Sequence, residues 1–584
     1  MNFFNVLTLC CGLAFFLFGM QTMSHNLERL AGGKLEGSLK KMTANPIISC
    51  ALGAIITIAM QSSSACTVML VGLVNSGIMH FSQTLNVIFG ANIGTTLTAW
   101  ILSLSGIESD AFFLQMLKPV NFSPILAVIG VFMTMLAKKE RNKSLGNILV
   151  GFAVLMYGMS FMSDAVSPLA DMPEFGALMV KFNNPAIGVL VGALFTALIQ
   201  SSAASVGILQ ALAMTGSVTY GMAIPIIMGQ NIGTCITAVI SCIGANTGAK
   251  RVAVMHTLIN MLGTVIILPV YLILNAIFRF PITNAPIDAF GIALCHTLFN
   301  LLATALLMPN GKLIIHLTEW LTRDKDVAED KDAQVCVLDE RLLRSPSVAV
   351  QECAEYTRQM CSLTRQTLQK AMSLFVHYDE AVAQDVVDLE HTVDLYEDRL
   401  GTFLVKLSAQ ALSQTAADEV SVMLHTIGDF ERMSDHAVNI KEVAEELREK
   451  DLSFSGEAQQ ELTVLTNAID EILSLTEMAF LNNDALAATN VEPLEQVVDK
   501  LITKIKAHHI IRLQKGECSI VLGFILSDLL NNYSRISDHC SNVAVAVIEV
   551  EQGSFDTHKY LNEVKYGSEE FAAKYEVYSA KYPL

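Results

Sequence analysis

The sequence predicts an all-α protein in two parts: a polytopic membrane part of two inverted repeats with re-entrant hairpins, followed by soluble helical bundles. Three observations predict this fold class. Residues 44–107 and 182–249 contain no Asp, Glu, Lys or Arg, which a water-soluble fold could hardly arrange over such lengths. Several short motifs recur at one fixed spacing. From about residue 335, apolar residues recur every three or four positions with charges between them, which is the pattern of amphipathic helices.

The charge distribution separates the two parts. Residues 1–320 carry 14 Lys and Arg against 10 Asp and Glu, whereas residues 321–584 carry 24 against 46. The acidic part argues against a nucleic-acid partner, because a phosphate backbone requires a positive surface. The 12 cysteines show no paired metal-ligand spacing, so neither a disulfide framework nor a zinc site is expected. We expect a membrane domain over 1–320, a linker over 321–334, helical bundles over 335–555 and a tail over 556–584.

The membrane part contains an internal repeat with a single offset of 139 residues. Gln61-Ser62-Ser63-Ser64-Ala65 recurs as Gln200-Ser201-Ser202-Ala203-Ala204. Asn-Pro, Gly-Ala and Asn-Ile-Gly-Thr landmarks share that offset, so biased composition alone is a poor explanation. The repeats run over about 5–137 and 145–277, and extra spans reach residue 308.

The two repeats are expected to have opposite orientations in the membrane. The stretch after the first span, residues 24–43, carries Arg29, Lys34, Lys40 and Lys41, whereas the matching stretch 163–182 carries only Lys181. Basic loops stay in the cytoplasm. The duplication therefore predicts inverted-topology repeats of the kind found in membrane transporters.

Each repeat contains an apolar segment that is too short to cross the membrane. It opens with Asn-Pro and ends about 14 residues later in Gln-Ser-Ser, whereas a span needs roughly 20 helical residues. A re-entrant hairpin with its tip at mid-membrane depth is the expected structure. The Asn-Ile-Gly-Thr segments, at 92–95 and 231–234, indicate broken helices.

These segments supply a candidate site for an anion together with a cation. An unwound helix offers N–H groups to an anion and carbonyl groups to a cation, and hydroxyl groups serve either ion. The alternative is that the small residues only let helices pack closely. Catalysis is not expected, since neither serine cluster has an acid or base beside it. The candidate binding residues are Gln61, Ser62, Ser63, Ser64, Asn92, Thr95, Gln200, Ser201, Ser202, Asn231 and Thr234.

A second pair of motifs follows, His256-Thr-Leu-Ile-Asn260 and His296-Thr-Leu-Phe-Asn300. Polar residues within an apolar span often mark a pathway. An interhelical hydrogen bond is the favoured interpretation here, and these residues are not in the first-choice site.

The acidic part also has an internal echo, in which residues 429–436 match 532–539. Two three-helix bundles are the simplest account. Carboxylates spaced four apart share a helix face, where they could hold a cation; a solvated acidic face is the alternative. The candidate metal ligands are Glu390, Asp394, Asp429, Glu431 and Asp435.

The duplicated Gln-Ser-Ser motifs, the Asn-Ile-Gly-Thr segments and the two His-Thr-Leu-x-Asn segments resemble the sodium/phosphate cotransporter family over roughly residues 5–308. That resemblance implies sodium-coupled phosphate transport, with the Gln-Ser-Ser loops holding substrate and sodium ions. The second loop has Ala203 where the first has Ser64, which puts the ion stoichiometry in doubt. The acidic part resembles the PhoU family of phosphate-uptake regulators, whose members often carry acidic clusters with a divalent metal or iron.

The expected function is therefore sodium-coupled transport of inorganic phosphate across the inner membrane, with a cytoplasmic PhoU-like regulatory domain. Two alternatives remain: a membrane-anchored phosphate sensor, and a transporter of another oxyanion such as sulfate or arsenate. The expected partners are phosphate and membrane lipid. A homo-oligomer and a regulatory protein partner stay open, as do the direction of transport and the ion stoichiometry.

Overall fold

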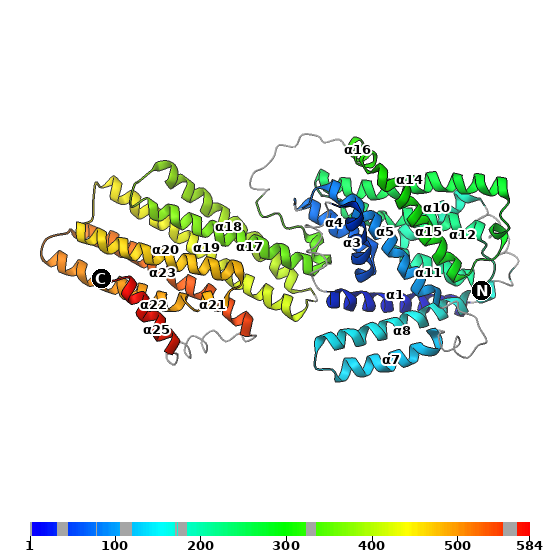
Figure 1. The fold of residues 1–584 in the computed structure, drawn as a ribbon, viewed down its shortest axis with the longest axis horizontal. Coiled ribbons are helices and arrows are strands. Elements are labelled where there is room, and N and C mark those ends of the chain that lie inside the picture. Colours follow the sequence, from blue (N-terminus) through cyan, green and yellow to red (C-terminus); the bar gives the residue numbers. More distant parts are fainter. Residues whose placement is uncertain are drawn as a thin grey trace. The chain divides into compact units, whose positions relative to one another are not determined.

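The computed structural model describes residues 3–31, 45–77, 79–104, 119–169, 172, 184–322, 335–410, 412–552 and 569–584. These residues are helical apart from connecting loops and one isolated bridge between Thr219 and Pro286. They form two compact units (Figure 1), Met1–Val327 with Asp339–Val348, and Ala328–Leu338 with Ala349–Leu584. Of the basic residues that predict membrane orientation, Lys34, Lys40, Lys41 and Lys181 lie outside the described residues.

The first unit is built of apolar helices. Six helices of its described residues are long and apolar enough to cross a membrane, or seven if the bent pair α3 and α4 is one span. The helices are α1 (Phe3–Ala31), α3 (Pro46–Met60), α4 (Ser63–Asn75), α5 (Phe81–Ser103), α7 (Pro119–Leu136), α8 (Glu140–Val166), α10 (Pro185–Ile199), α11 (Ser202–Ala213), α12 (Tyr220–Thr234), α13 (Ile236–Ser241), α14 (Thr247–Phe278), α15 (Ala289–Leu307) and α16 (Gly311–Leu321). Short 3-10 turns are η2 (Ser167–Leu169), η3 (Pro281–Asn284), η4 (Met308–Asn310) and η6 (Glu340–Arg344).

The sequence repeat is also a repeat of local structure. Both α3 and α10 have 15 residues, begin with proline after an asparagine N-cap, and end at a glutamine in the left-handed conformation. Their packing is duplicated too. A Cβ atom on Gly90 would lie 1.9 Å from the Cys50 carbonyl oxygen, and one on Gly229 would lie 2.1 Å from the Val189 carbonyl oxygen. Glycine at these positions therefore brings α5 against α3, and α12 against α10, at backbone contact.

The first helices of the two repeats, α1 and α8, lie side by side (Figure 1). Gly12 of α1 meets the backbone of Gly158, whereas Gly19 meets that of Gly151. The order of contacts is reversed, so the two helices run antiparallel. Because Gly12 and Gly151 are themselves equivalent across the repeat, as are Gly19 and Gly158, the pairing is self-complementary.

The prediction of broken helices at the Asn-Ile-Gly-Thr segments is wrong for the first repeat. Helix α5 continues from Phe81 to Ser103 without a break, and only the second repeat is interrupted, at Cys235 between α12 and α13. The physical reason is the role of the glycines. Gly90 and Gly94 face the backbone of α3, so they provide close packing instead of a break.

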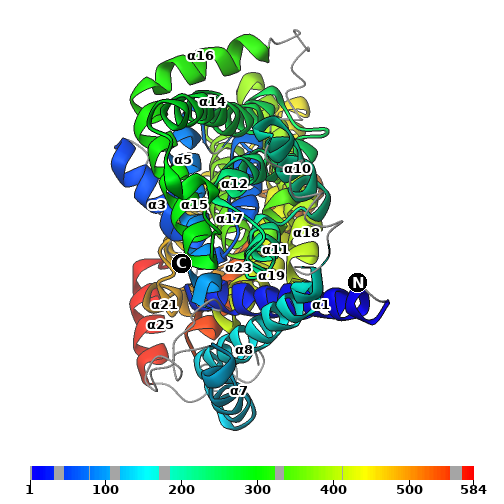
Figure 2. The ribbon, with the colours of Figure 1, turned by 90° about the vertical axis from the view of Figure 1, so that its right-hand side faces the viewer.

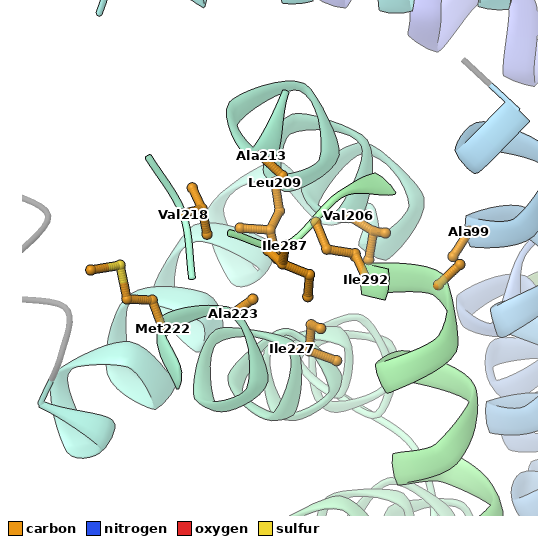
Figure 3. Close-up of a cluster of buried hydrophobic side chains, with 11 residues drawn as sticks. Ala99, Val206, Leu209, Ala213, Val218, Met222, Ala223, Ile227, Ile287 and Ile292 are labelled. Carbon is orange, nitrogen blue, oxygen red and sulfur yellow. The ribbon is translucent and has the colours of Figure 1, made fainter. Parts of the chain in front are cut away.

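A buried apolar cluster joins the two repeats behind the second hairpin. Figure 3 shows α11 residues including Leu209 facing α12 residues including Ile227, with Ile287 and Ile292 between them and Ala99 of α5 at the side. Helices α14 and α15 pack on α5 (Figure 2). These contacts fix the helices that carry the candidate site residues.

The second unit is a pair of three-helix groups. The helices are α17 (Pro346–Ser373), α18 (Glu380–Ser408), α19 (Gln414–Glu449), α20 (Gly456–Asn482), α21 (Ala485–Ala488), α22 (Val491–Gln514), α23 (Ile520–Gln552) and α25 (Glu569–Lys581). The first group comprises α17, α18 and α19, and the second comprises α20, α22 and α23. The groups meet along α19 and α23. There His436 Nδ1 lies 2.8 Å from Asn532 Oδ1, and His539 Nδ1 lies 2.8 Å from Asp429 Oδ1. The sequence echo thus lies along the contact between the two groups.

Candidate functional site

The two serine loops, defined as residues 61–64 and 200–203, form the same turn. Gln61 has a φ of 50° and Gln200 a φ of 56°, so each ends its first helix in the left-handed conformation. Ser62 and Ser201 are extended and cap the next helix, accepting hydrogen bonds from the backbone N–H of Ala65 (3.1 Å) and Ala204 (3.2 Å). At the first loop the chain direction changes by 120° between α3 and α4. The chain therefore turns back at the predicted tip.

This turn places opposite partial charges next to each other. The first helix ends in carbonyl groups that carry partial negative charge, and the second begins with N–H groups that carry partial positive charge. The capping hydroxyl groups accept one bond each, and their O–H groups can still donate. One end of the turn therefore suits a cation and the other an anion.

The first serine loop is held to α5 of its own repeat. Thr98 Oγ1 donates to Gln61 Oε1 (3.2 Å), and Gln61 Nε2 donates to the Ile58 carbonyl (2.8 Å). Gln61 and Ser63 are both buried. Gln200, in contrast, is exposed, so the two predicted glutamines have different surroundings.

Two threonines beside the loops were not among the predicted residues. Thr57 is buried and its hydroxyl has no hydrogen-bond partner in the described part of the chain. Its equivalent, Thr196, donates to Ser205 Oγ (2.8 Å) across the second hairpin. Both stand one turn before the loop at the same 139-residue offset, and that offset is the signal that could have found them.

The hydroxyl protons of the predicted threonines are used within their own helices. Thr95 donates to the Ala91 carbonyl and Thr234 to the Gln230 carbonyl, each at 2.9 Å. This is the bonding expected from the packing alternative. The oxygens keep lone pairs, so these side chains can serve a cation better than an anion.

The predicted asparagines are buried in each repeat. Asn92 Nδ2 donates to Asn260 Oδ1 of α14 (3.1 Å), and Asn231 Nδ2 donates to the Ile227 carbonyl of its own helix (2.9 Å). In each repeat the two helices of the hairpin pack against the helix that carries the Asn-Ile-Gly-Thr segment. Among the residues that the structure describes, no hydrogen bond joins one serine loop to the other, and their shared site stays a prediction.

The two histidines are deeply buried, His256 at 1% and His296 at 2% exposure. Asn260 and Asn300 donate to their respective His carbonyl groups, one turn earlier in the same helix. The expected interhelical bond exists for Asn260, which contacts α5. The Nδ1 atoms of the two imidazole rings have no hydrogen-bond partner among the described residues.

The predicted acidic metal cluster of the second unit has no support in the structure. No group of three or more His, Cys, Asp or Glu side chains among its described residues is arranged to hold a metal ion. The reason is that the candidates have other partners. Asp429 accepts from His539 and Asn542 on α23, while Arg432 lies 3.4 Å from Glu431 and 3.3 Å from Asp435.

The remaining candidates, Glu390 and Asp394, lie near Asp435. Burial, and then the charges of Asp435 and Asp394, raise the pKa of Glu390. Burial and Asp435 likewise raise the pKa of Glu431. This is a cluster of repelling carboxylates beside one guanidinium group, which does not establish a metal site.

Comparison with protein families gives two matches. Residues 15–164 and 154–294 match the family described as Na+/Pi-cotransporter, so the family domain occurs twice. Residues 357–444 and 462–547 match the PhoU domain, also in two copies. Among solved structures, the chain is similar to PhoU from Pseudomonas aeruginosa at 19% identity and a TM-score of 0.33, covering 35% of this chain and 97% of that one.

Curated relatives cover both parts of the chain. The uncharacterized protein YqeW of Bacillus subtilis is 30% identical over 44% of this chain and 80% of its own length. The putative inorganic phosphate export protein YjbB of Escherichia coli O157:H7 is 22% identical over 93% of this chain and 98% of its own. The sodium-dependent phosphate transport protein 2A of Oryctolagus cuniculus is 36% identical over 16% of this chain and 15% of its own. The chain therefore belongs to the Na+/Pi-cotransporter family and is a helical membrane protein of the phosphate-transporter class with a C-terminal PhoU domain.

Proposed function

We propose that the chain moves inorganic phosphate across the inner membrane, coupled to sodium, by alternating access between two inverted repeats. The observation that carries the proposal is the duplicated turn, in which a left-handed glutamine is followed by a serine that caps the next helix. Two such turns offer donors to an anion and acceptors to a cation.

The binding chemistry of the candidate residues supports a charge-neutral site. Phosphate would be held by the N–H groups at the start of α4 and α11 and by the hydroxyls of Ser62, Ser63, Ser64, Ser201 and Ser202. Sodium would be held by the carbonyl ends of α3 and α10 and by side-chain oxygens such as those of Thr95 and Thr234. The sodium ions would then supply the positive charge that no basic side chain supplies.

The antiparallel pairing of α1 with α8 supports inverted repeats. Gly12 of α1 meets Gly158 of α8, and Gly19 meets Gly151. In the repeat, Gly12 is equivalent to Gly151 and Gly19 to Gly158. A two-fold axis in the membrane plane produces such a pairing between copies of opposite orientation. Motion of one repeat against the other would then expose the site to either side.

The names of the relatives state different properties of phosphate transport. The rabbit relative is named as sodium-dependent and the Escherichia coli relative as an exporter. We propose that the gradients of sodium and phosphate set the direction, and that the PhoU domain regulates the flux from the cytoplasm. Lys312, Arg323 and Lys325 follow the last span, and basic residues there favour a cytoplasmic location for the PhoU domain. Arg323 and Lys325 lie outside the described residues.

Radiolabelled phosphate flux in proteoliposomes tests the proposal. With an inward sodium gradient the purified protein should accumulate phosphate, and replacing sodium by potassium should abolish accumulation. Reversing the sodium gradient on preloaded vesicles should drive efflux. Flux that ignores sodium would contradict the coupling, and no flux under any gradient would favour a sensor. Stronger competition by unlabelled sulfate or arsenate than by phosphate would change the substrate.

A further inference from the structure

We propose that Asn260 is a positioning residue that turns the amide of Asn92 so that its oxygen, and not its NH2 group, is offered to sodium. This inference rests on the proposed function, because it names the ion that one of the candidate residues serves. It concerns α14, which sequence reasoning left outside the site.

The orientation of Asn260 follows from a neighbour that can only accept. One side-chain atom of Asn260 lies 3.1 Å from the carbonyl oxygen of His256. A carbonyl oxygen has no proton, so the atom that faces it must be Nδ2. The same NH2 group lies 3.3 Å from Cys235 Sγ at the break between α12 and α13. Asn260 Oδ1 must therefore point the other way.

The orientation of Asn92 follows in turn. Asn260 Oδ1 faces Asn92 at 3.1 Å, and an oxygen acceptor requires a donor. The facing atom of Asn92 is therefore Nδ2, and Oδ1 is what remains. Asn92 Oδ1 accepts no hydrogen bond from the residues that the structure describes. The side chain is buried, with 7% exposure.

The second repeat reaches the same result by a different contact. Asn231 Nδ2 donates to the carbonyl of Ile227 on its own helix, so its Oδ1 is also the uncommitted atom. Both equivalent asparagines thus present an oxygen, although only the first needs α14 to do so. A buried amide oxygen attracts a hard cation and repels phosphate.

Removing one partner from this buried amide network raises the free energy of the folded state, because a buried amide without a hydrogen-bond partner has lost the solvation that it had in water. If Asn260 loses its acceptor oxygen, the Asn92 amide is free to present either end. We therefore expect weaker sodium binding without a direct change at the phosphate donors.

The test measures the KM for sodium at saturating phosphate, and the KM for phosphate at saturating sodium, in proteoliposomes. Asn260→Leu should raise the sodium KM by about two- to tenfold, the range that one net hydrogen bond covers. Its phosphate KM should stay unchanged.

Asn300→Leu is the matched control. Asn300 is buried like Asn260, belongs to the same motif and makes the same bond to the preceding histidine carbonyl. Among the described residues, it makes no hydrogen bond to Asn92 or Asn231. Its sodium KM should remain that of the wild type. If Asn260→Leu does not fold, Asn260→Ser, which is too short to reach Asn92, should show the same sodium effect.

A double variant separates positioning from general damage. In an Asn92→Ala background, Asn260→Leu should cause no further rise in the sodium KM, because Asn260 acts through Asn92. Additive effects, equal rises in both KM values, or an equal sodium effect in Asn300→Leu would overturn the inference. A wild-type protein whose flux ignores sodium would instead overturn the proposed function, and with it the assignment of the oxygen to sodium.

Discussion

Replacing Gly90 by alanine should separate the two helices that carry the first half of the site. A Cβ atom at this position would lie 1.9 Å from the Cys50 carbonyl oxygen and 2.8 Å from the Ala54 nitrogen. Carbon and carbonyl oxygen atoms normally approach no closer than about 3.3 Å. Helix α5 must therefore move away from α3 by roughly 1.4 Å, because backbone atoms on both sides cannot rotate out of the way.

The energetic cost should lie at the upper end of the range for overpacking, about 3 kcal/mol. Part of this is offset by the better helix propensity of alanine, about 1 kcal/mol. The movement also pulls Thr98 away from Gln61, whose bond is already 3.2 Å long. We expect a net loss of stability of about 2 kcal/mol and a loss of transport that exceeds the loss of folded protein.

The assay is thermal unfolding of the detergent-purified protein, combined with phosphate flux per folded molecule. Gly229→Ala should behave in the same way, since its Cβ would lie 2.1 Å from the Val189 carbonyl oxygen. Gly207→Ala is the control, because its nearest neighbours are the side-chain atoms of Met159 and Phe16 at 3.3 Å, which can shift. Equal stability and flux in the Gly90 and Gly207 variants would refute the reasoning.

Three further predictions follow from individual contacts. Thr57→Val removes a buried hydroxyl that has no partner among the described residues, so it should not lower the unfolding temperature. A raised sodium KM in flux assays would then identify the hydroxyl as an ion ligand. A lower unfolding temperature would contradict the absence of a hydrogen bond at this hydroxyl. Burial, and to a lesser extent the ring of His539, lower the pKa of His436 below 6.5. Below pH 6.5 the unfolded chain then binds more protons than the folded one. Amide exchange in α19 should therefore accelerate as the pH falls from 6.5 to 5, and His436→Gln should flatten that dependence. The same pH dependence in the wild type and in His436→Gln would contradict this role of His436. Arg341 donates to the carbonyl groups of Ser241 and Ile243 at the end of α13, so Arg341→Ala should increase proteolysis of residues 335–345, whereas equal cleavage would show that the contact does not hold the segment.

Much of the membrane unit could be predicted because its signals are local or periodic. The Asn-Pro start, the Gln-Ser-Ser end and the common offset each identify a backbone event: a helix cap, a turn or a close approach. Asn45 and Asn184 do cap α3 and α10, and the serines do cap α4 and α11. These features depend on residues near in sequence, so one sequence is enough to find them.

What could not be predicted depends on helices far apart in the chain. Nothing local distinguishes Gln61, which is buried against Thr98, from Gln200, which is exposed. The bond from Asn92 to Asn260 joins residues 168 positions apart. Similarly, Asp429 is a candidate metal ligand in the sequence, but the packing of α19 against α23 pairs its carboxylate with His539. Tertiary packing selects among partners that the local pattern leaves equal.

The central claim is that the two serine loops hold phosphate and sodium together. Sodium-driven phosphate flux of Ser63→Ala and Ser202→Ala in proteoliposomes tests it most directly, with Ser205→Ala, a buried serine that bonds Thr196 within the second hairpin, as a control for a lost hydroxyl. The account predicts that each loop variant loses most of its flux while remaining folded, and that the control retains it. Full flux in both loop variants would contradict the account.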